Sequence, residues 1–232
     1  MPDTPDAPDA PVNDAVRLVL ASQSPARLAT LAAAGVTPRV VVSDVDEPAV
    51  LDAARAGVGG DLDPADAVLV LARAKAEDVS GRVEGEESAL VLGCDSMLEL
   101  PGGRGEVVGK PSDAAEARRR WRSMRGRAAV LHTGHWLVDL RDPEDGGTGG
   151  TLGASSATTV HFADVDDAEI DAYVATGEPL HVAGAFTIDG LGGPYVDRIE
   201  GDHHGVVGLS LPLLRELLGE LGVPWRSLRS AG

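Results

Sequence analysis

Two hydroxyl side chains stand at the start of a predicted helix, in the segment LASQSPAR at residues 20–27. The first turn of a helix carries unpaired backbone N–H groups and the positive end of the helix dipole, so it attracts anions. Ser22, Ser24 and Arg27 are therefore candidates for binding phosphate. The alternative is that Ser22 or Ser24 only caps the helix, as most Ser-x-Pro starts do.

A set of carboxylates is the second candidate for chemistry. Asp44, Asp46 and Glu47 lie in a predicted acidic turn, and Asp95 follows the apolar run at residues 90–93. Hard divalent cations prefer oxygen ligands, and α/β sheets place their ligand sites beyond the carboxyl ends of strands. Asp95, which we expect at such a strand end, is the stronger candidate. The alternative is a turn residue in an acidic chain.

Lysine is rare in this chain, because only Lys75 and Lys110 are lysines among 20 Lys plus Arg residues. A compact ammonium suits a point contact with phosphate, whereas a guanidinium suits a bidentate contact. Both lysines are thus candidate phosphate ligands. Composition alone favours the other interpretation, in which both are ordinary solvated side chains.

Composition and charge exclude several classes of protein. The formal charge of −17 disfavours nucleic acid as a partner, since most of the surface would repel a polyanion. No apolar run approaches the roughly 20 residues of a membrane span, and the acidic, Pro-rich amino terminus does not resemble a signal peptide. We therefore expect a cytoplasmic protein that does not contact a membrane. Cys94, the single cysteine, excludes an intramolecular disulfide.

Several segments resemble motifs of known active sites but do not match them. The segment GEVVGKP at residues 105–111 lacks the P-loop spacing, and Pro111 stands where that loop needs a hydroxyl. The segment GLSLP at 208–212 lacks the second glycine of a nucleophile elbow. The six histidines lack zinc-site spacing, and Cys94 is more simply a buried apolar residue than a nucleophile.

Strands and helices that alternate along the chain would position these residues, which indicates an α/β protein. Residues 1–15 are predicted to be a disordered tail, residues 16–232 a single domain, and the Gly-rich segment 141–156 a flexible loop. Periodicity and turn residues predict strands over 16–21, 40–42, 90–93, 128–140, 157–162, 183–189 and 195–199, with a hairpin-like excursion over 107–111. Capping residues and periodicity predict helices over 26–34, 63–79, 112–124, 166–176 and 211–221.

Many short segments, in order, resemble the Maf-like family. Residues 20–31, LASQSPARLATL, resemble its signature, in which Leu-Ala-Ser-x-Ser-Pro is followed by two arginines. The resemblance covers about residues 16 to 222. Further matches are Asp46-Glu47, LARAKA at 71–76, GCDS at 93–96, GKP at 109–111, YVATGEP at 173–179, AGAF at 183–186, IEGD at 199–202 and VVGL at 206–209.

The resemblance implies a fold, an activity and a set of site residues. The fold would be an elongated mixed-sheet α/β fold related to inosine triphosphate pyrophosphatases, with two lobes flanking a central cleft and frequent homodimers. The activity would be hydrolysis of a nucleoside triphosphate to the monophosphate and pyrophosphate, with Mg, Mn or Co as the divalent cofactor. Asp95 would be the catalytic acid/base, and Glu47 and Asp95 would bind the metal. The triphosphate would lie among Ser22, Ser24, Arg27, Lys75 and Lys110.

The sequence also departs from the family pattern. Ala26 replaces the first of the two arginines, Ala129 stands where many members have a histidine, and Val182 stands where a lysine precedes AGA. Asp189 replaces a glutamine that is usual in the branch acting on thymidine and uridine triphosphates, so Asp189 is a candidate base contact. The alternative is that Asp189 ends a strand and shapes the turn at Gly190.

Two other function classes stay open at this stage. One is a regulator of cell division that binds nucleotide without turnover, and the other is a nucleotide-sugar or phosphate-ester enzyme with a similar layout.

Overall fold

The computed structural model describes residues 16–83, 85, 88–102 and 106–229. The tail that the sequence predicts over residues 1–15 lies outside the described residues. No helix among the described residues combines the length and the apolar character of a membrane span.

A seven-stranded mixed sheet forms the centre of the described structure, with strand order β2-β1-β3-β5-β6-β7 and β4 paired to β3. The β1 pairings with β2 and β3 are parallel, and the other pairings are antiparallel. This arrangement confirms the mixed α/β class. The strands are β1 (Arg17–Ala21), β2 (Arg39–Val40), β3 (Ala89–Glu99), β4 (Val107–Val108), β5 (Ala128–Asp139), β6 (Thr151–Phe162) and β7 (Val196–Glu200).

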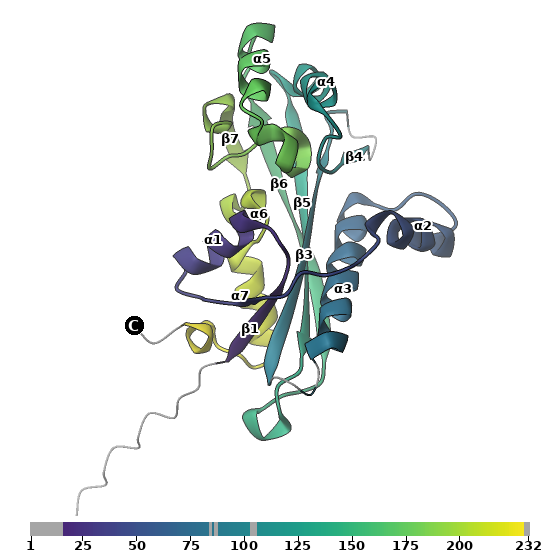
Figure 1. Ribbon diagram of the computed structural model, residues 1–232, viewed down its shortest axis with the longest axis vertical. Coiled ribbons are helices and arrows are strands. Elements are labelled where there is room, and N and C mark those ends of the chain that lie inside the picture. The colour runs from purple at the N-terminus through teal and green to yellow at the C-terminus, as the bar shows by residue number, and fades with distance from the viewer. Residues whose placement is uncertain (1–15, 84, 86–87, 103–105, 230–232) are drawn as a thin grey trace, which may run out of the picture.

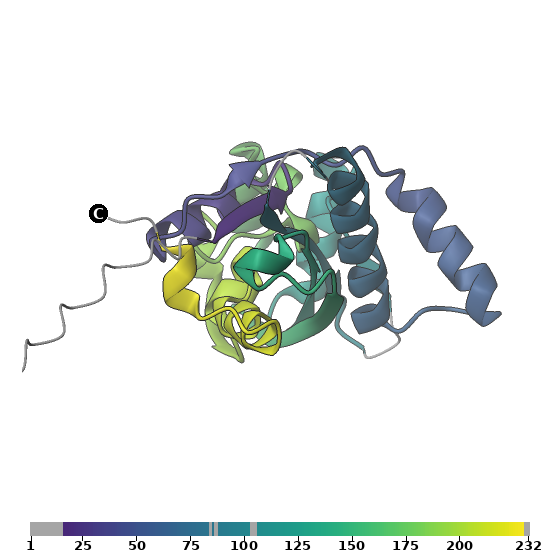
Figure 2. The same ribbon diagram turned by 90° about the horizontal axis from the view of Figure 1, so that it is seen from below.

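Helices cover both faces of the sheet (Figure 1). Helix α3 lies along one face with α2 outside it, and α1, α6 and α7 lie on the other side (Figure 2). Helices α4 and α5 form the upper end of the molecule in Figure 1. The helices are α1 (Pro25–Ala33), α2 (Glu47–Val58), α3 (Pro64–Val83), α4 (Ala114–Met124), α5 (Asp167–Ala175), α6 (His203–Val207) and α7 (Leu211–Glu220).

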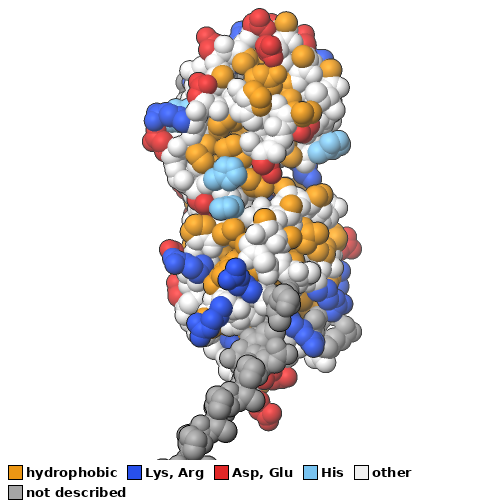
Figure 3. All heavy atoms as spheres, turned by 90° about the vertical axis from the view of Figure 1, so that its left-hand side faces the viewer, with side chains coloured by type: hydrophobic (Ala, Val, Ile, Leu, Met, Phe, Trp, Pro, Cys, Tyr) orange, Lys and Arg blue, Asp and Glu red, His pale blue; other side chains and the backbone are white. Residues whose placement is uncertain are grey.

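The described structure has a lower and an upper lobe, and each contains a large cluster of buried apolar residues. The lower core joins β1, α1 and α7 through residues such as Leu20, Leu31 and Leu214. In the upper core the Trp121 ring packs edge-on against Phe162 and Tyr173, at centroid distances of 5.5 and 5.4 Å. Strands β3, β5 and β6 run through both lobes, which makes the molecule elongated (Figure 1). Histidine side chains gather at the waist on the face shown in Figure 3.

Two glycines bring α3 unusually close to the sheet. A Cβ atom at Gly93 would lie 2.1 Å from the carbonyl oxygen of Ala72, and one at Gly134 would lie 2.3 Å from that of Val68. No side chain fits at either position, so the helix backbone packs directly on β3 and β5. This approach brings Lys75, on α3, within reach of side chains on β3.

Several sequence predictions of helix starts are confirmed. The Ser24 side chain accepts a hydrogen bond from the Arg27 backbone at the start of α1, with Pro25 in the first turn. Asp113 and Ser210 cap α4 and α7 in the same way. Each cap satisfies a backbone N–H that the helix itself leaves unpaired, which fixes where the helix begins.

Two of the long strands, β3 and β6, were predicted too short. Strand β3 does not end at Gly93 but continues to Glu99, and Asp95 lies inside it. Strand β6 begins at Thr151, so the flexible loop predicted over 141–156 is wrong for residues 151–156. Small and polar residues in both segments resemble turn residues, but their backbone groups pair with β5 on the neighbouring ladder.

Two other segments differ in kind from the predictions. Helix α2 was missed, because its start at Glu47-Pro48 resembles a turn and none of its residues is fully buried. The strand predicted over 183–189 is wrong, since Ala183–Ala185 form a 3₁₀ turn with Gly184 at φ 72°. A Cβ atom at Gly184 would also lie 2.7 Å from Leu98, so glycine is required there.

Candidate active site

An open stretch on one edge of β3 forms the floor of a cleft between the lobes. On that edge, β1 pairs with β3 as far as Gly93, and β4 pairs with it from Leu98 onward. Within the described residues, no strand pairs with this edge of β3 between them, over residues 94–97. Chain segments leaving β1 and β4 therefore converge on this stretch from opposite ends.

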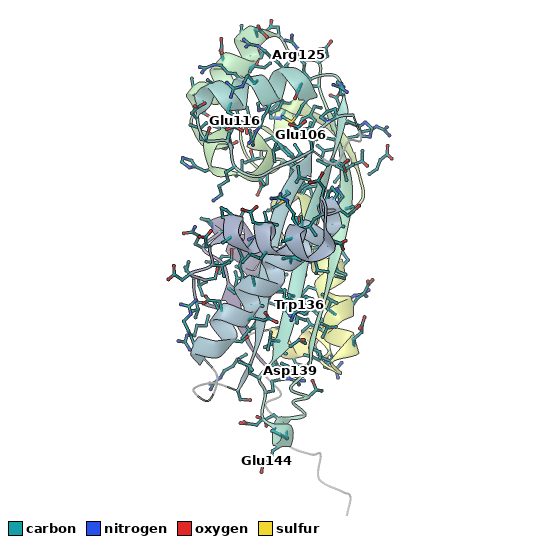
Figure 4. All side chains as sticks on the ribbon, turned by 90° about the vertical axis from the view of Figure 1, so that its right-hand side faces the viewer. Glu106, Glu116, Arg125, Trp136, Asp139 and Glu144 are labelled. Carbon is teal, nitrogen blue, oxygen red and sulfur yellow. The ribbon has the colours of Figure 1, made fainter. Side chains whose placement is uncertain are left out.

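The cleft has a volume of about 900 Å³, a size suited to a small-molecule ligand. Side chains from both lobes surround it; Glu116 and Arg125 mark the upper lobe and Trp136 and Asp139 the lower lobe in Figure 4. Most of the candidate residues named from the sequence border this cleft: Ser22, Ser24, Arg27, Glu47, Lys75, Asp95, Lys110 and Asp189.

The ammonium group of Lys75 joins two of the predicted carboxylates. Lys75 Nζ lies 2.6 Å from Asp95 Oδ1 and 2.7 Å from Glu47 Oε1. Asp95 and Lys75 are buried, while the Glu47 side chain is half exposed. The helix α3, the strand β3 and the start of α2 thus each contribute one charge to a single cluster.

Burial changes the acidity of this cluster. Desolvation raises the pKa of Asp95 above the usual value for an aspartate, and the positive charges of Lys75 and Arg27 oppose that rise. A carboxylate that is ionised but poorly solvated is a better proton acceptor than an exposed one. The neighbouring Cys94 thiol is fully buried, and burial raises its pKa to about 11. A thiolate nucleophile at this position is therefore disfavoured.

Arg27 ties the start of α1 to the floor and to the segment after α6. Its Nε donates to the carbonyl oxygen of Gly208 at 2.8 Å, and its two terminal nitrogens donate to Ser22 Oγ and Ser96 Oγ, each at 3.1 Å. Ser96 Oγ in turn lies 3.0 Å from Thr133 Oγ1 on β5. Arg27 therefore has a positioning role that the sequence alone did not indicate, besides its predicted contact with phosphate.

Of the two roles considered from the sequence for the hydroxyls at the helix start, the structure shows the capping role, for Ser24, and the contact with phosphate stays a prediction. Ser24 caps α1, and the Ser22 hydroxyl accepts from the Ser24 backbone N–H at 3.2 Å. Both residues also border the cleft. The helix start therefore faces the cleft with its positive end, as an anion site requires.

The remaining predicted residues lie apart from the Lys75 cluster. Lys110 is exposed and follows β4 on the upper lobe, and Asp189 is exposed on the loop after Phe186. Asp46 caps α2 through the backbone N–H of Ala49, at 3.1 Å, and neither Asp44 nor Asp46 is among the described residues that border the cleft.

The carboxylates of Asp95 and Glu47 are the groups of this cluster that could contact a divalent cation. Both face the same ammonium group, so they converge on a point where positive charge is stabilised. Among the described residues, no group of three or more His, Cys, Asp or Glu side chains could hold a metal ion. Two carboxylates are enough for Mg²⁺, which commonly takes its other ligands from water and from substrate phosphates.

Sequence reasoning missed several residues at the cleft. Ser96 borders the cleft and accepts a hydrogen bond from Arg27, and His181 and Glu178 border its upper wall; Thr133 lies behind Ser96 and contacts it from β5. Ser96 and Glu178 lie within GCDS and GEP, two of the segments that carry the resemblance, so a signal was present. For His181 no such pattern existed.

The fold and the cleft define a mixed α/β protein whose open strand edge brings carboxylates, a lysine and a helix start together. A family model described as Maf-like protein matches residues 17–221. The chain belongs to this family.

Curated relatives match along nearly their whole length. A protein of Salinispora tropica is 54% identical over 220 residues, which cover 94% of this chain and 89% of that protein. One of Leifsonia xyli subsp. xyli is 53% identical over 214 residues, covering 92% and 96% of the two chains. One of Streptomyces coelicolor is 52% identical over 206 residues, covering 89% and 91%. All three are named nucleoside triphosphate pyrophosphatase.

Proposed function

We propose that this chain is an enzyme that hydrolyses nucleoside triphosphates to the monophosphate and pyrophosphate, with Asp95 as its catalytic residue. The observation that carries the proposal is the position of the Lys75 ammonium, 2.6 and 2.7 Å from the carboxylates of Asp95 and Glu47, in a cleft that also contains the start of α1. The shared name of the relatives supports the same activity.

The triphosphate is bound by positive charge from both lobes. The start of α1 and the Arg27 guanidinium attract phosphate oxygens from the lower lobe, and Lys110 contributes an ammonium group from the upper lobe. Lys75, which borders the same cleft and contacts Asp95, contributes a further positive charge beside the reacting phosphate. Such fixed charges stabilise the negative charge that spreads over the phosphate oxygens in the transition state.

Asp95 orients a water molecule and accepts its proton. The water oxygen forms a bond to the α-phosphorus, the bond from that phosphorus to the bridging oxygen breaks, and pyrophosphate leaves with the electron pair. A divalent cation held by Glu47 and Asp95 would neutralise phosphate charge and assist the departure of pyrophosphate. A leaving group of this kind needs no strong acid, which agrees with the absence of a paired His-Asp motif in the sequence.

The test is a panel of canonical and modified nucleoside triphosphates, with monophosphate and pyrophosphate quantified separately and with EDTA as a metal-free control. Stoichiometric monophosphate and pyrophosphate, abolished by EDTA, are expected. Nucleotide-dependent thermal stabilisation without any product would favour a regulator. Orthophosphate as the first product, or cleavage of nucleotide sugars alone, would contradict the assigned bond.

A further inference from the structure

One loop of the upper lobe borders the cleft and has no role in the chemistry described above. Thr187, Ile188 and Asp189 line the cleft, and the loop continues to Gly192. We call residues 187–192 the wall loop. Leu131, Phe186 and Ile188 give this wall an apolar part, beside the polar side chains of Glu178, His181, Thr187 and Asp189. A phosphate chain held at the lower lobe would leave the nucleoside beside this apolar wall.

The carboxylate of Glu178 lies at the centre of the wall loop. Oε1 accepts hydrogen bonds from the Tyr173 hydroxyl at 3.0 Å, from the Thr187 hydroxyl, and from the Gly192 backbone N–H at 3.2 Å. Oε2 accepts from the Leu191 backbone N–H at 3.0 Å. Both oxygens are therefore occupied, and both ends of the loop depend on the same side chain. These donors favour the ionised carboxylate and hold the pKa of Glu178 below its usual value, against the effect of burial.

The wall loop packs so closely around Glu178 that two of its positions have no room for a side chain. A Cβ atom at Gly190 would lie 2.7 Å from Glu178 Oε2, and one at Gly192 would lie 2.5 Å from the Tyr173 hydroxyl. Just before the loop, the Trp121 indole N–H donates to the carbonyl oxygen of Ala185 at 2.8 Å, and Ala185 has a φ of 62°. The chain is thus fixed at both sides of the residues that border the cleft.

We propose that Glu178 is a positioning residue that holds the wall loop against the cleft and thereby determines how tightly, and how selectively, the nucleoside part of the substrate binds. The inference rests on the proposed nucleotide pyrophosphatase function. Glu178 contributes through Thr187, Ile188 and Asp189, whereas the reacting phosphate is proposed to lie beside Asp95 and Lys75, on β3 and α3. Loss of its hydrogen bonds therefore raises KM and reduces discrimination between bases, with little change in kcat.

The decisive variant is Glu178→Gln. A glutamine keeps one oxygen but has an amide NH₂ in place of the other. Depending on its orientation, either the Leu191 N–H or the groups that donate to Oε1 lose their hydrogen-bond acceptor. A matched control is Glu169→Gln. Glu169 also accepts from a tyrosine hydroxyl in the upper lobe, that of Tyr195 at 2.8 Å, but it lies on α5 and does not border the cleft.

The experiment measures kcat and KM for several nucleoside triphosphates, together with hydrogen exchange of backbone amides. For Glu178→Gln we expect KM to rise about tenfold or more, kcat to change less than about threefold, and the amides of Leu191 and Gly192 to exchange faster. The control should match the wild type. Thr187→Val removes a single donor, so it provides a milder variant, with an expected rise in KM of about threefold, if Glu178→Gln is unstable.

The outcomes separate this inference from the proposed function. Wild-type kinetics and unchanged exchange in a folded Glu178→Gln protein, or a lower kcat at unchanged KM, would overturn the positioning role while leaving the pyrophosphatase activity intact. A wild-type protein that releases no pyrophosphate would overturn the proposed function, and the inference with it.

Discussion

The substitution Asp95→Asn separates the charge of this residue from its shape. Asparagine has nearly the same size and keeps an oxygen that can accept the hydrogen bond from Lys75, now 2.6 Å long. It cannot accept a proton from water, however. We therefore expect the variant to fold and to bind nucleotide, but to lose turnover by about 10²-fold or more, which corresponds to about 2.7 kcal/mol in the activation barrier.

The expected effect on stability follows from the same contacts. Removing one partner of a buried ion pair costs about 3–5 kcal/mol when the other charge is left alone. Lys75 still has Glu47 at 2.7 Å and the amide oxygen of the new residue, so its charge stays compensated. In addition, the buried carboxylate no longer has to be desolvated. We expect the free energy of unfolding to fall by at most about 2 kcal/mol.

The assay is pyrophosphate release at saturating nucleotide, with binding measured by titration calorimetry and unfolding by chemical denaturation. A matched control is Asp139→Asn, because Asp139 is also buried and paired with a cation, Arg141 at 2.8 Å, but does not border the cleft. The control should lose stability and keep its turnover per folded molecule. If folded Asp95→Asn retains activity within a few-fold of the wild type, Asp95 has no part in proton transfer.

The remaining cations, the base contact and the ion pair far from the cleft can be tested with the same assays. Lys75→Ala should lower the free energy of unfolding by about 3 kcal/mol, since it leaves buried negative charge unpaired. Lys110 is exposed, so Lys110→Ala should change the free energy of unfolding by less than about 0.5 kcal/mol. Both variants should reduce kcat/KM, and equal losses of stability would contradict the burial argument. Arg27→Lys should reduce kcat/KM about tenfold, because one ammonium cannot reproduce three hydrogen bonds that point in different directions, and a fully active variant would refute this. Asp189→Gln should shift the relative kcat/KM among uridine, thymidine, cytidine and guanosine triphosphates by about tenfold, because a carboxylate only accepts hydrogen bonds whereas an amide also donates; an unchanged ranking would return base selection to other residues. Hydrogen bonds donated by Arg141 and Thr148 lower the pKa of Asp139 in the folded protein. The Asp139 carboxylate therefore contributes fully to the free energy of unfolding above the ordinary pKa of 3.8, and this contribution is lost as pH falls through the lower folded value. Denaturation at pH 7 and pH 3 should show that the difference in stability between the wild type and Asp139→Asn is smaller at pH 3.

The sequence indicated the elements whose ends carry a chemical signal. Ser24 with Pro25 marked the start of α1, and Ser210 marked that of α7, because a side chain that caps a helix is visible in the sequence. The continuation of β3 through Asp95 was not visible. Its polar residues gain their strand conformation from the ladder with β5, which is a contact between distant parts of the chain.

The candidate site shows the same division. Residues near Asp95 were identified by type and by resemblance, and the structure brings Lys75 and Glu47 to it. Asp95 was expected at the end of its strand, but β3 continues to Glu99. The strand that ends next to Asp95 is the neighbouring β1, whose pairing with β3 stops at Gly93. The hydrogen bonds of Glu178 could not be predicted, because its four donors come from α5 and from the wall loop, and none has a distinctive spacing in the sequence.

The three long strands that run through both lobes have a mechanical consequence. In many enzymes two rigid bodies swing together around a ligand, and part of the interaction energy drives that motion. Strands β3, β5 and β6 are backbone-paired along most of their length across the waist, so a rotation of one lobe against the other would have to twist or bend this shared sheet. The width of the cleft is therefore largely set before the ligand binds. Recognition in such a cleft depends on the local fit of loops and side chains, and differences in ligand preference between relatives would be confined to those segments.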